Sequence, residues 1–388
     1  MKPLVTSLIL TVGLSWMPPV WGQQTPLPSP AMEALEVTQR LEGDVGWDDR
    51  LFGPSGDKRS LLRAIDYSLQ YLQTPKAIED YTKLNHPEIN RDRVRQSLIR
   101  FRQILANSRN AAELQRAVQR EFTGYQSVGN DGQGTVGFTG YFEPTYRGSR
   151  TRTAQYRYPL YARPADFEDW DKPHPTRLEL EGEDGLGAQS PLRGTEIVWL
   201  RDRLEAFLVH VQGSAQIQLP NGQVMTVGYA GKTDHPYTSI GKELVNAGIF
   251  PLESLTLPKL IDYFHQFPEQ MNEYLPRNQS FIFFKETQGQ PATGNLSVPV
   301  TAGRSIATDK SIMPPGALAV IHAPLPEPNA QGQLEPTLVS RFVLDQDTGS
   351  AIKGAGRVDV FMGTGSEAGD RAGLTHSNGE LYYLLLKR

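Results

Sequence analysis

The segment from Phe342 to Gly373 constrains the fold of this chain more than any other. It opens with a short apolar run of strand character, Phe342 to Leu344, and turn-forming residues from Asp345 to Ser350 then interrupt that run. A second apolar run surrounds a single acid, Asp359. Seven glycines follow Asp347 within the segment, so the backbone passes close to a neighbour or takes positive φ repeatedly. Two carboxylates beside glycine-rich loops are typical of a site, although either aspartate alone could simply cap a turn.

The length of 388 residues is compatible with two domains, or with one domain that carries a large insertion. Residues 1–22 have the pattern of a secretory signal peptide, with Lys2, an apolar core and small residues before Gln23. Residues 23–56 are expected to form a poorly ordered linker that begins with a proline-rich stretch. No second apolar run suggests a transmembrane helix after cleavage.

Composition excludes several function classes. The net charge of -4 gives no support for nucleic-acid binding. The absence of cysteine excludes disulfides, thiolate catalysis and cysteine-ligated zinc. The seven histidines are scattered without metal-ligand spacing, and no dinucleotide fingerprint follows a strand, so neither a metal nor an organic cofactor is expected.

Hydrophobic periodicity divides the chain into a helical part and β parts. Leu61, Leu62, Ile65, Leu69 and Leu72 share one face at helical spacing, and the whole stretch 57–122 is predicted to be helical. From residue 135 onward, alternating apolar residues predict strands. We expect a strand over 206–219, interrupted by the polar residues Gln212, Gly213 and Ser214. A helix is predicted to begin near Ser239, beyond Lys232 and Tyr237.

Two observations concern possible ligands and catalysts. Five of the 15 tyrosines lie between residues 141 and 161, where each could stack on a sugar or simply occupy a half-buried sheet. With zinc, serine-elbow and dinucleotide patterns absent, carboxylates are the plausible catalysts, and Asp347 and Asp359 lead. The sequence Asp347-Thr348-Gly349-Ser350 also matches the short signature of aspartic proteases. Those enzymes need two such carboxylates, and this chain has one copy, so only a homodimer could complete the pair.

Several motifs in a fixed order resemble the lytic murein transglycosylase A (MltA) family over residues 120–388. They are FTGYFEP, HVQGSAQIQL, YAGKTDHPYTSIGKELV, VTAGRSIATDKSIMPPG and DTGSAIKGAGRVDVFMGTGSEAGDRAG. The resemblance implies a mainly β fold with an N-terminal helical region. It implies a double-psi β-barrel catalytic domain, called a 3D domain, and a second β domain inserted into it. We expect the division 57–139 for the helical part, 140–275 for the inserted domain and 276–388 for the barrel.

The resemblance also implies a reaction and a substrate. The family cleaves the β-1,4 bond between N-acetylmuramic acid and N-acetylglucosamine in peptidoglycan and leaves a 1,6-anhydromuramic end. Its catalytic aspartate falls on Asp359, and the aspartate of its D-x-G-x-A-I-K-G element falls on Asp347. We expect Asp347 to act as a supporting carboxylate that raises the pKa of Asp359. The expected partner is a peptidoglycan glycan strand, bound by a monomer in the periplasm or cell envelope. The chain lacks the lipobox cysteine of lipid-anchored members.

The predicted substrate-binding residues are polar side chains in apolar or glycine-rich surroundings. They are Thr139, Tyr141, Gln212, Gly213, Ser214, Lys232, Tyr237, Ser239 and Arg304. For Lys232 and Arg304, a structural ion pair is an equally good interpretation. A cell-wall protein that binds glycan without cleaving it also remains an alternative.

Overall fold

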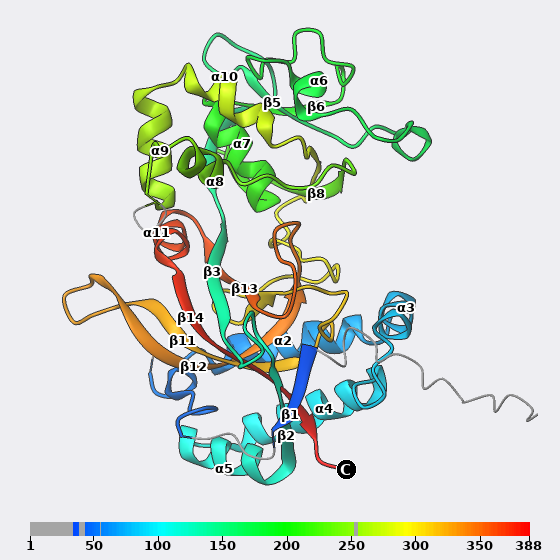
Figure 1. Cartoon of the computed structure of the whole chain (residues 1–388), viewed down its shortest axis with the longest axis vertical. Coiled ribbons are helices and arrows are strands. Elements are labelled where there is room, and N and C mark those ends of the chain that lie inside the picture. The colour runs from blue at the N-terminus through cyan, green and yellow to red at the C-terminus, as the bar shows by residue number, and fades with distance from the viewer. Residues whose placement is uncertain (1–33, 39–42, 55, 252–254) are drawn as a thin grey trace, which may run out of the picture.

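The computed structural model describes residues 34–38, 43–54, 56–251 and 255–388. The predicted signal peptide lies outside the described residues. Within the described part, no helix combines the length and the apolar character needed to cross a membrane. Figure 1 shows two units stacked along the long axis, with the N- and C-terminal parts of the chain together in the lower unit and the middle of the chain in the upper one.

The helices of the lower unit confirm the helical structure predicted for residues 57–122. They are α2 (Lys58–Tyr71), α3 (Pro75–Leu84), α4 (Arg91–Asn107) and α5 (Ala111–Glu121). The side chains of Thr74, Asn90 and Asn110 cap the last three by accepting from the backbone N–H three residues further on. Their apolar faces join the barrel strands in one hydrophobic core, so these helices pack against the barrel.

The lower unit contains a closed barrel of six strands. They are β3 (Val136–Glu143), β10 (Ser305–Ala307), β11 (Leu318–Pro328), β12 (Leu334–Asp347), β13 (Arg357–Thr364) and β14 (His376–Leu386). The strand order is β14-β11-β12-β10-β13-β3, and the pairing of β3 with β14 closes the ring. Two further strands, β2 (Phe122–Ser127) and β1 (Leu35–Thr38), extend the sheet from β14. The predicted fold class is confirmed, while the double-psi crossing stays a prediction.

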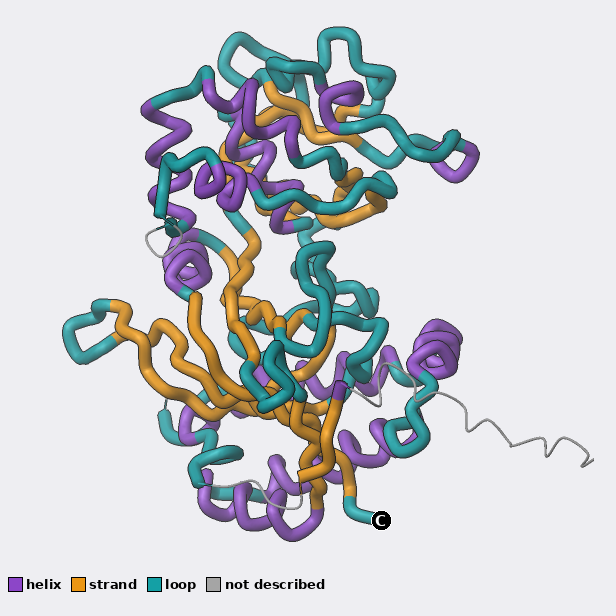
Figure 2. The backbone as a smooth tube through the Cα atoms, viewed as in Figure 1, coloured by secondary structure: helices purple, strands orange, loops and turns teal. Residues whose placement is uncertain are grey.

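The upper unit is built on a second sheet with helices around it, as Figure 2 shows. Its strand order is β5-β6-β4-β7-β8-β9. The strands are β4 (Thr145–Ser149), β5 (Tyr158–Tyr161), β6 (Glu196–Leu200), β7 (Ser214–Gln218), β8 (Val224–Lys232) and β9 (Ile282–Glu286). The helices are α6 (Arg177–Glu181), α7 (Arg203–Gln212), α8 (Ile240–Asn246), α9 (Leu257–Gln266) and α10 (Gln270–Tyr274). Because β9 pairs with β8, this sheet continues past residue 275.

The expected strand over residues 206–219 is wrong for its first half, which is helix α7. The side chain of Asp202 caps this helix by accepting from the backbone N–H groups of Leu204 and Glu205. Gly213 ends it with φ of 81°, a left-handed conformation that glycine adopts without strain. The nearly continuous apolar run from Ala206 to Val211 has no period of two, so it could not by itself distinguish a buried helix from a buried strand.

The chain crosses between the units after β3 and again between β9 and β10. Glu143, at the end of β3, is buried with 2% of its surface exposed. One of its carboxylate oxygens accepts from Thr364 of β13 at 2.9 Å and from Gln216 of β7 at 3.2 Å. A single carboxylate therefore ties the barrel to the second sheet where the chain first crosses.

Candidate active site

Barrel register places the two leading carboxylates in one row. Ala307 of β10 pairs with Asp347 of β12 on one side and with Asp359 of β13 on the other, and Asp359 pairs with Thr139 of β3. Paired residues on adjacent strands point to the same face of a sheet. Only the methyl group of Ala307 stands between the two aspartates in this row. The sequence alone could not have shown this, because β10 is distant from both aspartates in the chain.

Asp347 is fixed by three hydrogen bonds that occupy both of its oxygens. Oδ1 accepts from the backbone N–H groups of Asn295 and Thr348, each at 2.8 Å. Oδ2 accepts from the hydroxyl of Tyr141, also at 2.8 Å. Burial has the largest effect and raises the pKa of Asp347 above its ordinary value, while the three donors oppose this rise. The three donors favour the charged form of Asp347, and that charge contributes to the raised pKa of Asp359.

Strand β12 continues to Asp347, beyond the point where the turn residues were expected to end it. Asp345, which was expected to begin that turn, is completely buried in the barrel. It accepts hydrogen bonds from Lys310, from Thr308 at 2.8 Å and from Tyr383 at 2.7 Å. Because these donors satisfy the carboxylate, a charged residue can remain inside the strand.

Asp359 differs from Asp347 in having almost no partners. Its side chain is 21% exposed, and its Oδ1 is buried without a hydrogen bond. The closest cation is Arg357, whose Nη2 lies 3.9 Å from this oxygen. Burial raises the pKa of Asp359 to about 6, with the charge of Asp347 adding to the rise and Arg357 opposing it. Asp359 can therefore hold a proton at mildly acidic pH and release it, as a general acid and base must do.

Asp359 opens into a cavity of about 640 Å³ between the two units. Residues of both units line it: Thr139, Tyr141, Arg357 and Asp359 come from barrel strands, and the 349–352 loop closes one side. From the upper unit come α7, the start of α8 and the segment before β9. Of the predicted binding residues, the structure brings Thr139, Tyr141, Gln212, Tyr237 and Ser239 to this cavity.

Arg304 is not part of this cavity, and the alternative of a structural ion pair is the one found. Its side chain is completely buried. It donates to Asp48 and Asp57, with the closest contacts to each at 2.5 Å, and to the carbonyl oxygen of Phe342 at 2.8 Å. Buried guanidinium groups require such compensation. Arg304 therefore anchors the segment that precedes α2 to the barrel.

The other predicted residues lie close to the cavity without lining it. Lys232 donates to the carbonyl oxygens of Thr233 and His235, at 3.3 and 3.4 Å, rather than to a carboxylate. Gly213 ends α7, and Ser214 pairs with Gly228 in the second sheet. Gln212, the neighbour of both, accepts from the backbone N–H of Phe142 at 3.1 Å and so joins α7 to β3.

Sequence reasoning missed several lining residues, among them Arg177, His210, Lys242 and Arg357. Arg177 is buried and donates to the carbonyl oxygens of Asn278 and Ser280, so it braces the segment before β9. Burial holds the pKa of His210 well below its usual range, which leaves the ring neutral. Only Arg357 carried a signal: it precedes Asp359 by two residues, and strand residues two apart share a face. Among the described residues, no group of His, Asp and Glu could hold a metal ion.

Two family models match the chain in the order that the motifs predicted. The MltA specific insert domain matches residues 137–285, and the 3D domain matches residues 304–385. The second match covers most of the barrel strands, including both aspartates. The first begins in β3 and ends in β9, so it spans the second sheet together with one strand of the barrel.

Similar proteins and structures agree with these matches. The chain is 33% identical to membrane-bound lytic murein transglycosylase A of Escherichia coli K12 over 67% of this chain and 68% of that protein. It is 32% identical to the protein of that name from Vibrio cholerae over 68% of each chain. A membrane-bound lytic murein transglycosylase from Agrobacterium tumefaciens superposes with a TM-score of 0.70 at 25% identity, covering 88% of this chain and 95% of that one. E. coli MltA with bound chitohexaose gives 0.67 at 25% identity, over 92% and 95% of the two chains. The chain belongs to the lytic murein transglycosylase A family.

Proposed function

We propose that this protein is a lytic transglycosylase that cleaves the β-1,4 bond between N-acetylmuramic acid and N-acetylglucosamine in peptidoglycan and forms a 1,6-anhydromuramic end. Family membership supports the reaction class. The relative from E. coli whose structure contains chitohexaose supports a glycan strand as the ligand. The cavity between the two units supplies a place for such a strand beside Asp359.

The observation that carries the proposal is the difference between the two carboxylates. Asp359 has an oxygen without a partner and a pKa raised to about 6 by burial, so it can protonate the leaving glycosidic oxygen. The carboxylate that results can then accept the proton of the muramic C6 hydroxyl as that oxygen attacks C1. The proton given in the first step is recovered in the second, and no water is consumed.

A hydrolytic mechanism would need a second carboxyl group that activates water or attacks the sugar. Asp347 is the nearest acid in the row, but both of its oxygens already hold donors. Tyr141 and two backbone N–H groups would have to be displaced before it could bind a nucleophilic water. We therefore assign to Asp347 the supporting role of keeping the pKa of Asp359 high. The same commitment of Asp347 argues against an aspartic-protease pair.

Substrate binding is assigned to the polar residues that line the cavity: Thr139, Tyr141, Gln212, Tyr237 and Ser239. We further propose that the protein acts as a monomer in the periplasm or cell envelope, where peptidoglycan is found. The signal pattern of residues 1–22 supports export. The relatives named above are described as membrane-bound.

Digestion of purified peptidoglycan in heavy-oxygen water tests the reaction. Ring closure by the C6 hydroxyl gives a product that carries no label at C1 and is lighter by one water than the hydrolysis product. Hydrolysis would place heavy oxygen at C1, and labelled product as the main species would overturn the proposal. Asp359→Asn should lower turnover by at least about a hundredfold. Glycan binding by the unchanged chain with no released product would instead favour a wall-binding protein.

A further inference from the structure

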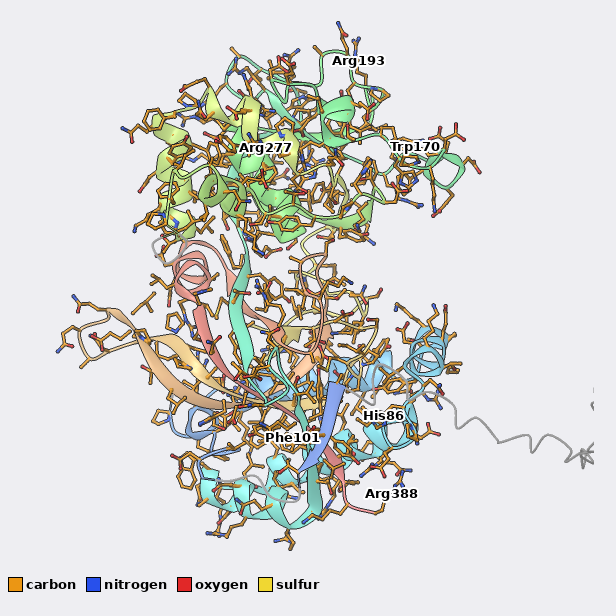
Figure 3. All side chains as sticks on the ribbon, viewed as in Figure 1. His86, Phe101, Trp170, Arg193, Arg277 and Arg388 are labelled. Atoms are coloured by element: carbon orange, nitrogen blue, oxygen red, sulfur yellow. The ribbon has the colours of Figure 1, made fainter. Side chains whose placement is uncertain are left out.

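When Asp359 is protonated, the residues that line its cavity carry a net positive charge, although the chain as a whole does not. The net charge of the sequence is -4. Among the described lining residues, the carboxylates are Glu243 and Asp359. Glu243 is neutralised by Arg277, whose Nη1 donates to it at 2.9 Å; Figure 3 shows Arg277 in the upper unit. Asp359 must be protonated to start the reaction proposed above. In that state no unpaired anion in the described lining balances Lys242 and Arg357.

Arg177 also lines the cavity but pairs with Glu181, whereas the other two lining cations, Lys242 and Arg357, have unused donors. Lys242 is exposed in the first turn of α8, and within the described part of the chain its ammonium group makes no hydrogen bond or ion pair. Arg357 donates through Nη2 to Thr139 at 3.0 Å, while its Nε is buried without an acceptor. A buried donor that lacks an acceptor costs free energy, so a ligand that supplies an acceptor there gains affinity.

A second pair of cations extends this charge beyond the cavity. Lys232 belongs to β8 of the upper unit, and Lys353 follows the 349–352 loop of the barrel. Burial, and to a smaller extent the charge of Lys353, lowers the pKa of Lys232, while the charge of Asp234 opposes this. Lys353 is 71% exposed and lies 3.9 Å from Asp309. Each unit therefore contributes one of these lysines, and Asp234 and Asp309 offset part of their positive charge.

We infer that this cleft binds the carboxylates of muramoyl residues and that Lys242 makes the principal contact with them. The inference rests on the function proposed above and names the feature of the substrate that the site selects. Muramic acid carries a lactyl group that ends in a carboxylate or in a peptide with its own carboxylates, whereas N-acetylglucosamine is uncharged. Lysine suits this task because a compact ammonium group on a flexible stem can follow a carboxylate without requiring one geometry. The cleft therefore favours an acidic glycan over a neutral one.

Binding to the Asp359→Asn protein tests this inference without requiring turnover. The first ligand is a peptide-free glycan strand with lactyl carboxylates, and the second is the same strand after conversion of those carboxylates to methylamides. The acidic strand should bind about fivefold more tightly at low salt, and 0.5 M sodium chloride should remove most of the difference. A third arm with peptide-bearing strands shows whether the lactyl group or the peptide supplies the carboxylate.

Substitutions in the same background locate the contact. Lys242→Gln should remove most of the preference for the acidic strand and leave the affinity for the neutral strand unchanged. Lys242→Arg, which keeps the positive charge, should keep the preference for the acidic strand. Lys83→Gln removes one positive charge from α3, far from the cleft, and should change neither affinity. Equal affinity for the two strands, or a preference that survives Lys242→Gln, overturns the inference. Because these are equilibrium measurements, they remain decisive even if the heavy-oxygen experiment refutes the proposed reaction.

Discussion

At the scale of single residues, the buried carboxyl group of Asp359 should lower the stability of the folded chain once it is ionised. Its pKa is about 6 in the folded chain, against roughly 3.9 for an unfolded aspartate. The folded state therefore binds the proton more tightly, and this stabilisation is lost as pH rises from about 4 through about 6. The pKa difference of about two units means that the free energy of unfolding is roughly 2–3 kcal/mol lower above this pH window than below it.

Asp359→Asn, which does not titrate, should consequently be more stable than the parent chain at pH 7.5. Thermal unfolding followed by circular dichroism between pH 4 and pH 8 measures the difference. The advantage of the variant should grow between pH 4 and pH 6 and should shrink to nearly nothing at pH 4, where both side chains are uncharged. A constant difference across the whole range would show that Asp359 is not the group whose pKa is raised.

The pH dependence of activity should depend on Arg357. Its positive charge lowers the pKa of Asp359, so Arg357→Gln should raise that pKa. Because the acid must start protonated, kcat/KM falls as pH rises through this pKa, and the falling limb should move to higher pH in the variant. Arg357→Lys keeps a positive charge and should leave the limb near its original position. A shift to lower pH would contradict the assignment of the acid.

The two aspartates were found from sequence because strand-like runs and glycine-rich turns surround them. Their different roles could not be predicted in that way. The donors that fix Asp347 come from Tyr141, Asn295 and Thr348, two of which are remote in sequence. Arg304 shows the opposite problem: a charged residue in apolar, glycine-containing surroundings pairs with Asp48 and Asp57 inside the fold. Only tertiary contacts distinguish these cases.

At the scale of elements, local signals predicted the helices of residues 57–122 because caps and one-sided periodicity agree there. They failed at α7, whose apolar run has no polar face to reveal its period. Helix α11 (Ser366–Leu374) was not predicted either, because Gly369 and Gly373 disfavour a helix by propensity. Close packing explains one of these glycines: a Cβ at Gly369 would lie 2.9 Å from the ring of Phe142.

The contact between β3 and α11 can be tested at Gly140, which follows Thr139, the residue of β3 that pairs with Asp359. A Cβ at this position would lie 2.8 Å from Cα of Ala372 and 3.1 Å from the hydroxyl of Thr375. Because backbone must move to admit it, Gly140→Ala should destabilise the chain by about 1–3 kcal/mol. Gly137→Ala in the same strand is the matched control, since its nearest neighbour would be 3.6 Å away. Chemical denaturation should separate the two, and equal midpoints would contradict this packing.

At the scale of the whole molecule, the cavity exists because two units face each other, and few covalent links hold them there. The chain crosses only after β3 and between β9 and β10 in the described structure. Sequence patterns marked both units as β-rich, but the angle between them depends on side-chain contacts across the junction. Gln212 contacts the backbone of Phe142, and Glu143 accepts from Thr364 and Gln216. These contacts fix the distance between Asp359 and the binding residues of the upper unit.

Glu143→Ala should therefore loosen the two units while leaving each of them folded. The substitution leaves the hydroxyl of Thr364 and the amide of Gln216 without their acceptor in a buried place, which costs about 1–3 kcal/mol. We expect a higher KM for long glycan strands and a broader interatomic distance distribution in small-angle scattering, since the upper binding residues no longer hold one position. Glu286→Ala is the control, because Glu286 pairs with Arg150 at the surface of the upper unit and such pairs contribute little. If both variants scatter and bind like the parent chain, the orientation of the units is maintained by apolar packing rather than by Glu143.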